Sequence, residues 1–240
     1  MIQILKNAKL LHRCVDYLTH QIESRMPLVP VEVADEKSSM LEADDILPRP
    51  EKSPARSPRE ESPSDRSPQN SFNISVCGEE EVPDFHGCGI TDILTCISPE
   101  RPVMRPNWPS LRNHLIVRCD DVEEPLQDYV CPNEEHVRQI IQFGHDTLNR
   151  NRRGDTVNIL VHCAAGISRS TAATLLILSM KMGKGTEAAA MRHLTSIRPI
   201  CRPNAEIVRH GDRLLQREGR IIQQVTMWKM RHYPAAAVYG

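Results

Sequence analysis

The stretch Val161-His162-Cys163-Ala164-Ala165-Gly166-Ile167-Ser168-Arg169-Ser170-Thr171 decides how the rest of the chain is interpreted. The apolar run from Val157 to Val161 predicts a buried strand that ends near His162, and a helix is predicted to begin near Arg169. Between them the chain turns within six residues. The spacing His-Cys-x-x-Gly-x-x-Arg-Ser/Thr is expected by chance in about one chain of this size in ten thousand. The pattern is therefore specific.

A loop of this kind has the parts needed to bind a tetrahedral oxyanion. Gly166 allows a left-handed or closely approached backbone, so that the N–H groups of the loop Ala164, Ala165, Gly166, Ile167 and Ser168 form a nest at a helix N-terminus. The same positive field favours the thiolate of Cys163, which makes this cysteine a candidate nucleophile. Arg169 offers a planar fork for two phosphate oxygens. Ser170 can donate its hydroxyl to the thiolate.

The segment resembles the signature loop of the cysteine-dependent protein tyrosine phosphatases, and its surroundings resemble the dual-specificity branch. The similarity extends over about 150 residues, roughly 71–219, and includes Ile197-Arg-Pro-Ile-Cys-Arg-Pro-Asn204. It implies hydrolysis of phosphotyrosine, and also of phosphoserine or phosphothreonine, in a phosphorylated protein substrate. The resemblance implies a phosphocysteine at Cys163 and no cofactor or metal, and it gives His162 the task of orienting the loop.

The implied mechanism also needs a general acid and base, for which two aspartates are candidates. Asp120 and Asp121 follow a predicted strand, as the acid of similar phosphatases does. We favour Asp121, because the acid in similar sequences tends to precede an aliphatic residue, here Val122, and we keep Asp120 as the alternative. Cys96, at the end of another predicted strand, lies where some phosphatases keep a thiol that protects the nucleophile as a reversible disulfide. A plain buried cysteine is the alternative there.

Short β-rich runs alternate with helical periodicities after residue 71. Strands are predicted at 72–76, 91–97, 114–117 and 157–161, and helices at 133–148, 168–182, 186–197 and 204–216. This order predicts an α/β three-layer sandwich with a central, mostly parallel sheet of four or five strands flanked by helices.

Composition divides the chain into four parts. The 240 residues carry a net charge of -1 and an aromatic content of 4%, with no aromatic residue between Tyr17 and Phe72. Residues 27–70 hold eight of the 18 prolines and four Ser-Pro pairs, which predicts a disordered linker. Residues 1–26 are expected to form an amphipathic helix, whose stripe over residues 4–22 could dock on the domain or mediate self-association. The catalytic domain is expected at 71–220 and a C-terminal tail at 221–240.

Several functional classes are disfavoured by the sequence. The balanced charge gives no pull toward nucleic acid, and the longest apolar run, from Ala172 to Leu178, is too short for membrane insertion. The eight cysteines contain no Cys-x-x-Cys pair, so we expect reduced thiols and no metal site, in the cytoplasm or alternatively the nucleus. Two alternatives stay open: a lipid or inositol phosphatase on the same scaffold, which the uncharged loop disfavours, and a catalytically inactive phosphate-binding module.

Overall fold

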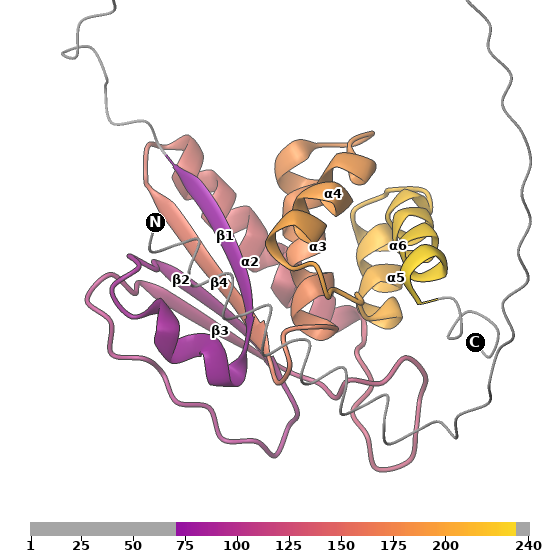
Figure 1. Ribbon diagram of the computed structural model, residues 1–240, viewed down its shortest axis with the longest axis horizontal. Helices are drawn as coiled ribbons and strands as arrows, with labels where there is room; N and C mark the ends of the chain where they lie inside the picture. The colour runs from indigo at the N-terminus through magenta and orange to yellow at the C-terminus, as the bar shows by residue number, and fades with distance from the viewer. Residues whose placement is uncertain (1–70, 234–240) are drawn as a thin grey trace, which may run out of the picture. The chain divides into compact units, whose positions relative to one another are not determined.

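The computed structural model describes residues 71–233. The helix expected at 1–26, the linker at 27–70 and the end of the tail at 234–240 lie outside this range. The described part contains a four-stranded sheet in the order β1-β4-β2-β3, in which every pairing is parallel (Figure 1). The elements are β1 (Phe72–Gly78), η1 (Glu79–Phe85), β2 (Asp92–Ile97), β3 (Asn113–Arg118), α2 (Glu134–Arg152), β4 (Val157–Cys163), α3 (Arg169–Met182), α4 (Glu187–Ile197), α5 (Ala205–Leu214) and α6 (Arg220–His232).

The two faces of the sheet have different covers. On β4, Ile159 and Val161 point into the larger core under the helices, whereas Leu160 packs in a smaller core under η1 and the irregular segment before β3. Strands buried on both faces need apolar residues at consecutive positions, which explains the unbroken apolar run of β4. The predicted class, a mostly parallel sheet flanked by helices, is confirmed. The second face is covered by a 3-10 helix and loops, with no α-helix in the part of the chain that is described.

Helix α3 lies at the centre of the helical layer (Figure 1). It contacts the sheet as well as α2, α4 and α5, and its residues from Arg169 to Ser179 are buried. A helix that is apolar on all sides is stable only when it is enclosed in this way. The enclosure fixes the N-terminus of α3 at the carboxyl edge of the sheet, directly after β4.

The segment expected to be a tail contains helix α6. Ile221 and Val225 are buried against the rest of the core, and Trp228 Nε1 donates a hydrogen bond of 2.8 Å to the carbonyl oxygen of Cys201. Asp212 of α5 accepts from the backbone N–H groups of Gly219 and Ile221, at 2.7 and 2.8 Å, and so holds the start of α6. A boundary at residue 220 would therefore divide a packed unit. Among the described residues, no helix is long and apolar enough to span a membrane.

Candidate active site

The signature segment forms the connection between β4 and α3, as the sequence predicts. Cys163 is the last residue of β4, and Arg169 is the first of α3. Gly166 has a φ of 71°, and a Cβ at this position would lie 2.4 Å from the carbonyl carbon of Cys77 on β1. Both the left-handed conformation and the close approach to β1 therefore require glycine.

The carbonyl oxygens of the loop are held outward by donors from the surrounding structure. These donors are Glu79 N to Ala164 O (3.0 Å), Arg198 Nη2 to Ala165 O (3.1 Å), Arg198 Nε to Gly166 O (2.9 Å) and Arg202 N to Ile167 O (2.8 Å). Because a peptide carbonyl and the following N–H point in opposite directions, the N–H groups turn toward the centre of the loop. Within residues 71–233, only the N–H of Gly166 among these loop groups has a partner, the Cys163 sulfur.

Arg198 and Glu81 brace this loop, and the sequence analysis assigned a role to neither. Arg198 is 3% exposed, and its Nη2 lies 3.0 Å from a carboxylate oxygen of Glu81 in η1. Glu81 also accepts from the backbone N–H of Gly78 at the end of β1. The Arg198 guanidinium thus joins η1 to two loop carbonyls. The only signal in the sequence is the Arg-Pro motif around Arg198, since Glu81 lies in an acidic run that gives no indication of a buried partner.

The Cys163 sulfur lies at the bottom of the loop, and the residue as a whole is 1% exposed. It accepts from the Gly166 N–H at 3.3 Å, and it lies 3.1 Å from the hydroxyl oxygen of Ser170 in the first turn of α3. The Gly166 N–H, the Ser170 hydroxyl and the N-terminus of α3 thus converge on this sulfur. The structure therefore brings Cys163, Gly166 and Ser170 together as the sequence suggests.

Arg169 lies at the opposite side of the loop with its guanidinium buried. One terminal nitrogen donates to the carbonyl oxygen of Cys119 at 2.6 Å, which holds the side chain in place. Its Nε is buried and has no hydrogen-bond partner among the described residues. A buried guanidinium N–H without an acceptor is costly unless a ligand supplies one. Arg169 is thus prepared to donate to an anion at the loop.

The two candidate acids differ in what they contact. Asp121 accepts from the Ser168 hydroxyl at 2.6 Å and from the Asn204 amide at 3.0 Å, and it lies 3.8 Å from Arg169 Nε. The Asp120 carboxylate instead accepts from the backbone N–H of Val130 at 2.8 Å, outside the loop. Of the two, Asp121 is the one that the structure brings to the signature loop.

Asp120 is held in its ionised form by hydrogen bonds. A hydrogen bond from Ser98 lowers the pKa of the Asp120 carboxyl, and the backbone of Val130 adds to this effect. A carboxyl held ionised by such donors is a poor proton donor near neutral pH. The role of Asp120 in the structure is to tie the two ends of the segment between residues 120 and 130.

His162 directs its Nε2 at β2 and carries no charge near neutral pH. Burial lowers its pKa to about 4, the neighbouring His114 contributes, and the backbone of Cys163 opposes the shift. Its Nε2 lies 2.7 Å from the hydroxyl oxygen of Thr95 on β2. This environment fits a neutral residue that orients the end of β4 better than a general base.

Cys96 lies beside the nucleophile on the neighbouring strand. Because Thr95 pairs with His162 in the register of β2 and β4, Cys96 is at the level of Cys163. Cys96 is fully buried, and burial raises the pKa of its thiol well above the ordinary value, with further contributions from the nearby Cys119 and Cys163. Cys96 is therefore a protonated thiol at neutral pH. The cysteines from Cys77 to Cys201 are free.

No cluster of three His, Cys, Asp or Glu side chains able to hold a metal ion exists between residues 71 and 233. The loop offers its backbone N–H groups and the Ser168 hydroxyl as donors, and Arg169 follows it at the start of α3.

The fold and this loop resemble those of the cysteine-dependent phosphatases of the dual-specificity-like branch, and curated proteins of this kind match parts of the chain. No protein-family model matches the chain. Human protein phosphatase Slingshot homolog 3 is 44% identical over 57 residues, 24% of this chain and 8% of that protein. Dual specificity protein phosphatase 1 of Arabidopsis thaliana is 32% identical over 120 residues, 50% of this chain and 52% of that protein.

These matches cover about half or less of the curated relatives. Among solved structures, the Yvh1 phosphatase domain of Chaetomium thermophilum is 23% identical, with 63% of this chain and 95% of that chain covered and a TM-score of 0.47.

Proposed function

We propose that the protein is a cysteine-dependent protein phosphatase that hydrolyses phosphotyrosine and also phosphoserine or phosphothreonine. The observation that carries the proposal is the orientation of the loop peptides: their carbonyls are bonded outward, so that the N–H groups and the free Nε of Arg169 surround the Cys163 sulfur. Such an array stabilises the charge of a phosphoryl group in transfer more than that of a neutral ligand.

In the first step the Cys163 thiolate attacks phosphorus, forming an S–P bond while the bond from phosphorus to the leaving oxygen breaks. Arg169 and the loop N–H groups bind the equatorial phosphoryl oxygens. Asp121, protonated at the start, transfers its proton to the leaving oxygen, which departs as an alcohol or phenol. The product is a phosphocysteine and an ionised Asp121.

In the second step water attacks phosphorus, Asp121 takes a proton from it, and the S–P bond breaks to return the thiolate. The Ser170 hydroxyl, 3.1 Å from the sulfur, stabilises the departing thiolate by donating a hydrogen bond. The cycle uses no oxidant, cofactor or metal.

The activity can be tested with purified protein and p-nitrophenyl phosphate in the presence of EDTA. We expect turnover by the unmutated protein, none by Cys163→Ser, and a fall in kcat of about 10²-fold for Asp121→Ala. Asp120→Ala is the matched control for the acid. Unchanged turnover by the serine variant would sink the assignment, and a larger loss with Asp120→Ala than with Asp121→Ala would transfer the acid role to Asp120.

A phosphorylated protein is favoured as substrate because the loop presents only small or apolar side chains at Ala164, Ala165 and Ile167. An inositol ring with several phosphates would require further cations around the loop. Paired assays on phosphotyrosine and phosphothreonine peptides and on a phosphoinositide measure this preference. A kcat/KM higher for the phosphoinositide than for either peptide would favour the lipid alternative.

We also keep the prediction that Cys96 can form a reversible disulfide with Cys163. Oxidation of Cys163 by peroxide gives a sulfenic acid, which a neighbouring thiol converts to a disulfide with loss of water. We expect peroxide-treated Cys96→Ser protein to regain less activity with dithiothreitol than the unmutated protein. Cys201→Ser, another buried cysteine, is the control. Equal recovery of the two variants would exclude the protective role.

A further inference from the structure

A chain of hydrogen bonds crosses three strands behind the nucleophile. The hydroxyl oxygen of Thr95 on β2 lies 2.7 Å from Nε2 of His162 on β4 and 2.7 Å from Nε2 of His114 on β3. His162 precedes the nucleophile Cys163 directly, whereas His114 lies on the edge strand of the sheet. The chain thus connects the edge of the sheet with the residue next to Cys163.

The hydroxyl group of Thr95 has a single proton and can donate to only one of the two rings. The other ring must then donate to the hydroxyl oxygen. The hydrogen bonds therefore run either from His162 to His114 or from His114 to His162. The direction decides which nitrogen of neutral His162 carries its proton, because Nε2 donates to Thr95 in the first case and accepts from it in the second.

The second nitrogen of His162, Nδ1, is the one left to interact with the backbone of Cys163. Nδ1 is buried and has no hydrogen-bond partner of good geometry among the described residues, and the nearby backbone of Cys163 favours a proton on the ring. When the hydrogen bonds run from His114 to His162, Nδ1 carries an N–H directed at this backbone. When they run the other way, Nδ1 is a bare acceptor. The choice of tautomer thus changes the electrostatic surroundings of Cys163.

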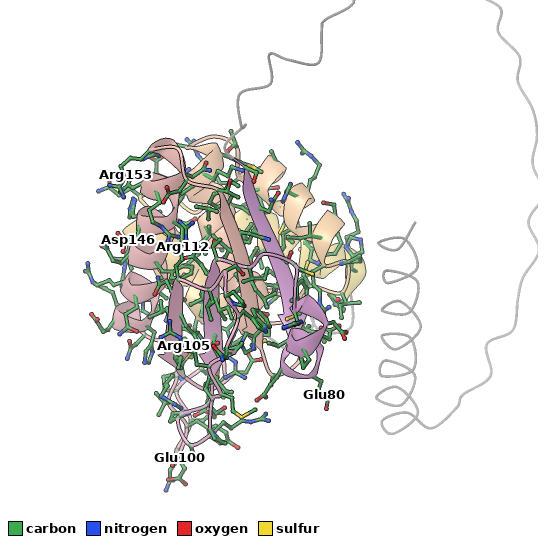
Figure 2. All side chains as sticks on the ribbon, turned by 90° about the vertical axis from the view of Figure 1, so that its left-hand side faces the viewer. Glu80, Glu100, Arg105, Arg112, Asp146 and Arg153 are labelled. Atoms are coloured by element: carbon green, nitrogen blue, oxygen red, sulfur yellow. The ribbon has the colours of Figure 1, made fainter. Side chains whose placement is uncertain are left out.

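His114 is the member of the chain that solvent reaches. It is half-buried and lines a groove of about 610 Å³ between β3 and α2. The charged groups around it are Arg105, which precedes β3, and Glu135, Arg138 and Asp146, which line the same groove from α2. Figure 2 shows Arg105 over the strands and Asp146 on the neighbouring helix. Burial lowers the pKa of His114 below its ordinary value of 6.5, and Arg105 adds to this.

We propose that His114 is a positioning residue that sets the tautomer of His162 through the Thr95 hydroxyl, and thereby tunes the reactivity of Cys163. Protonated His114 has N–H groups on both nitrogens, so its Nε2 must donate to Thr95, and Thr95 must donate to His162 Nε2. One proton is taken up overall. Both hydrogen bonds reverse, and the single proton of His162 moves from Nε2 to Nδ1.

The direction of the effect follows from electrostatics. The charge on His114 and the Nδ1–H dipole of His162 both favour the Cys163 thiolate. We call the hydrogen-bonded chain from His114 through Thr95 to His162 the relay. With the relay in place, mildly acidic solution converts less of the thiolate to the thiol than it would otherwise. By linkage, formation of the thiolate favours uptake of a proton by His114. The value of this relay to catalysis rests on the proposed function, but the linkage itself is a property of the three side chains and the thiol.

The linkage is measured by the rate at which iodoacetamide alkylates Cys163 between pH 4.5 and 8, followed by mass spectrometry of the peptide that contains Cys163. We expect His114→Gln and Thr95→Val to shift the acid limb of this profile upward by about 0.5 pH unit, which is about a threefold slower reaction on that limb. Thr95→Ser keeps the hydroxyl, and the exposed His145→Gln removes a histidine of α2. Both should follow the unmutated protein. Coincident profiles for all five proteins would overturn the proposal.

A second measurement needs no variant. Nitrogen-15 NMR of the histidine side chains in the full chain should show that His162 carries its proton on Nδ1 once His114 is charged. A proton that stays on Nε2 at every pH would overturn the relay. Alkylation and NMR require no turnover, so a protein that shows the linkage but leaves p-nitrophenyl phosphate intact would contradict only the proposed function. Turnover without the linkage would contradict only the relay.

Discussion

Replacing Arg198 with lysine separates the charge of this residue from its geometry. Arg198 donates to Gly166 O at 2.9 Å, to Ala165 O at 3.1 Å and to Glu81 at 3.2 Å. An ammonium group keeps the charge opposite Glu81 but cannot reach all three acceptors in the fork geometry of a guanidinium. At least one hydrogen bond to a loop carbonyl is lost, and a hydrogen bond to a charged group contributes ~1.5–3 kcal/mol.

A loss of about 2 kcal/mol that falls entirely on the loop would lower kcat/KM about 30-fold. Urea unfolding should show that Arg198→Lys remains folded with a free energy of unfolding reduced by about 2 kcal/mol or less. Arg202→Lys is the matched control, because Arg202 holds Ile167 O through its backbone nitrogen and not its side chain. If Arg198→Lys is destabilised while its kcat/KM on p-nitrophenyl phosphate stays within about twofold, the guanidinium does not orient the loop.

Three further changes test other parts of the site. Gly166→Ala adds a methyl group 2.4 Å from the backbone of β1 in a left-handed conformation, and we expect a loss of about 3 kcal/mol in the free energy of unfolding together with loss of turnover. His162, with its pKa lowered to about 4, should make the free energy of unfolding fall by up to roughly 3 kcal/mol between pH 6.5 and pH 4, because the unfolded chain binds a proton in this interval and the folded chain does not. Asn204→Asp keeps the oxygen that caps α5 but replaces the amide that donates to Asp121, so kcat should fall about tenfold while stability changes by less than about 1 kcal/mol.

Each of these three predictions has a control variant that separates the proposed cause from other effects of the substitution. Gly183→Ala adds a methyl group to another left-handed glycine with open space around it, and so measures backbone strain alone. Denaturant unfolding of His162→Asn at pH 7 and pH 4.5 should give a smaller difference than the unmutated protein, and an equal difference would assign the pH dependence to other groups. Asn204→Ala removes both the cap and the amide. If its kcat equals that of the unmutated protein, Asn204 does not position Asp121.

The sequence predicted the sheet and the strand-turn-helix around Cys163 because their determinants are local. The apolar run of β4, the glycine of the loop and the arginine that begins α3 follow one another directly, and their spacing leaves one short strand-turn-helix arrangement. The predicted strands agree with β1, β2, β3 and β4 to within two residues at each end. Helix α6 was not predicted from the sequence because it has few buried residues. Ile221 and Val225 are buried only once α4 and α5 have packed against α6.

The sequence by itself therefore determined the order of strands and helices and the positions of the proposed nucleophile, Cys163, and of the arginine proposed to bind the anion, Arg169. Tertiary structure decided which aspartate meets them, because Asp120 and Asp121 are adjacent in the chain and only the fold turns one toward Ser168 and Asn204. It also decided what holds the loop, since Arg198 and Glu81 are 117 positions apart. Contacts over such separations depend on how layers pack, and no local pattern of residue types encodes them.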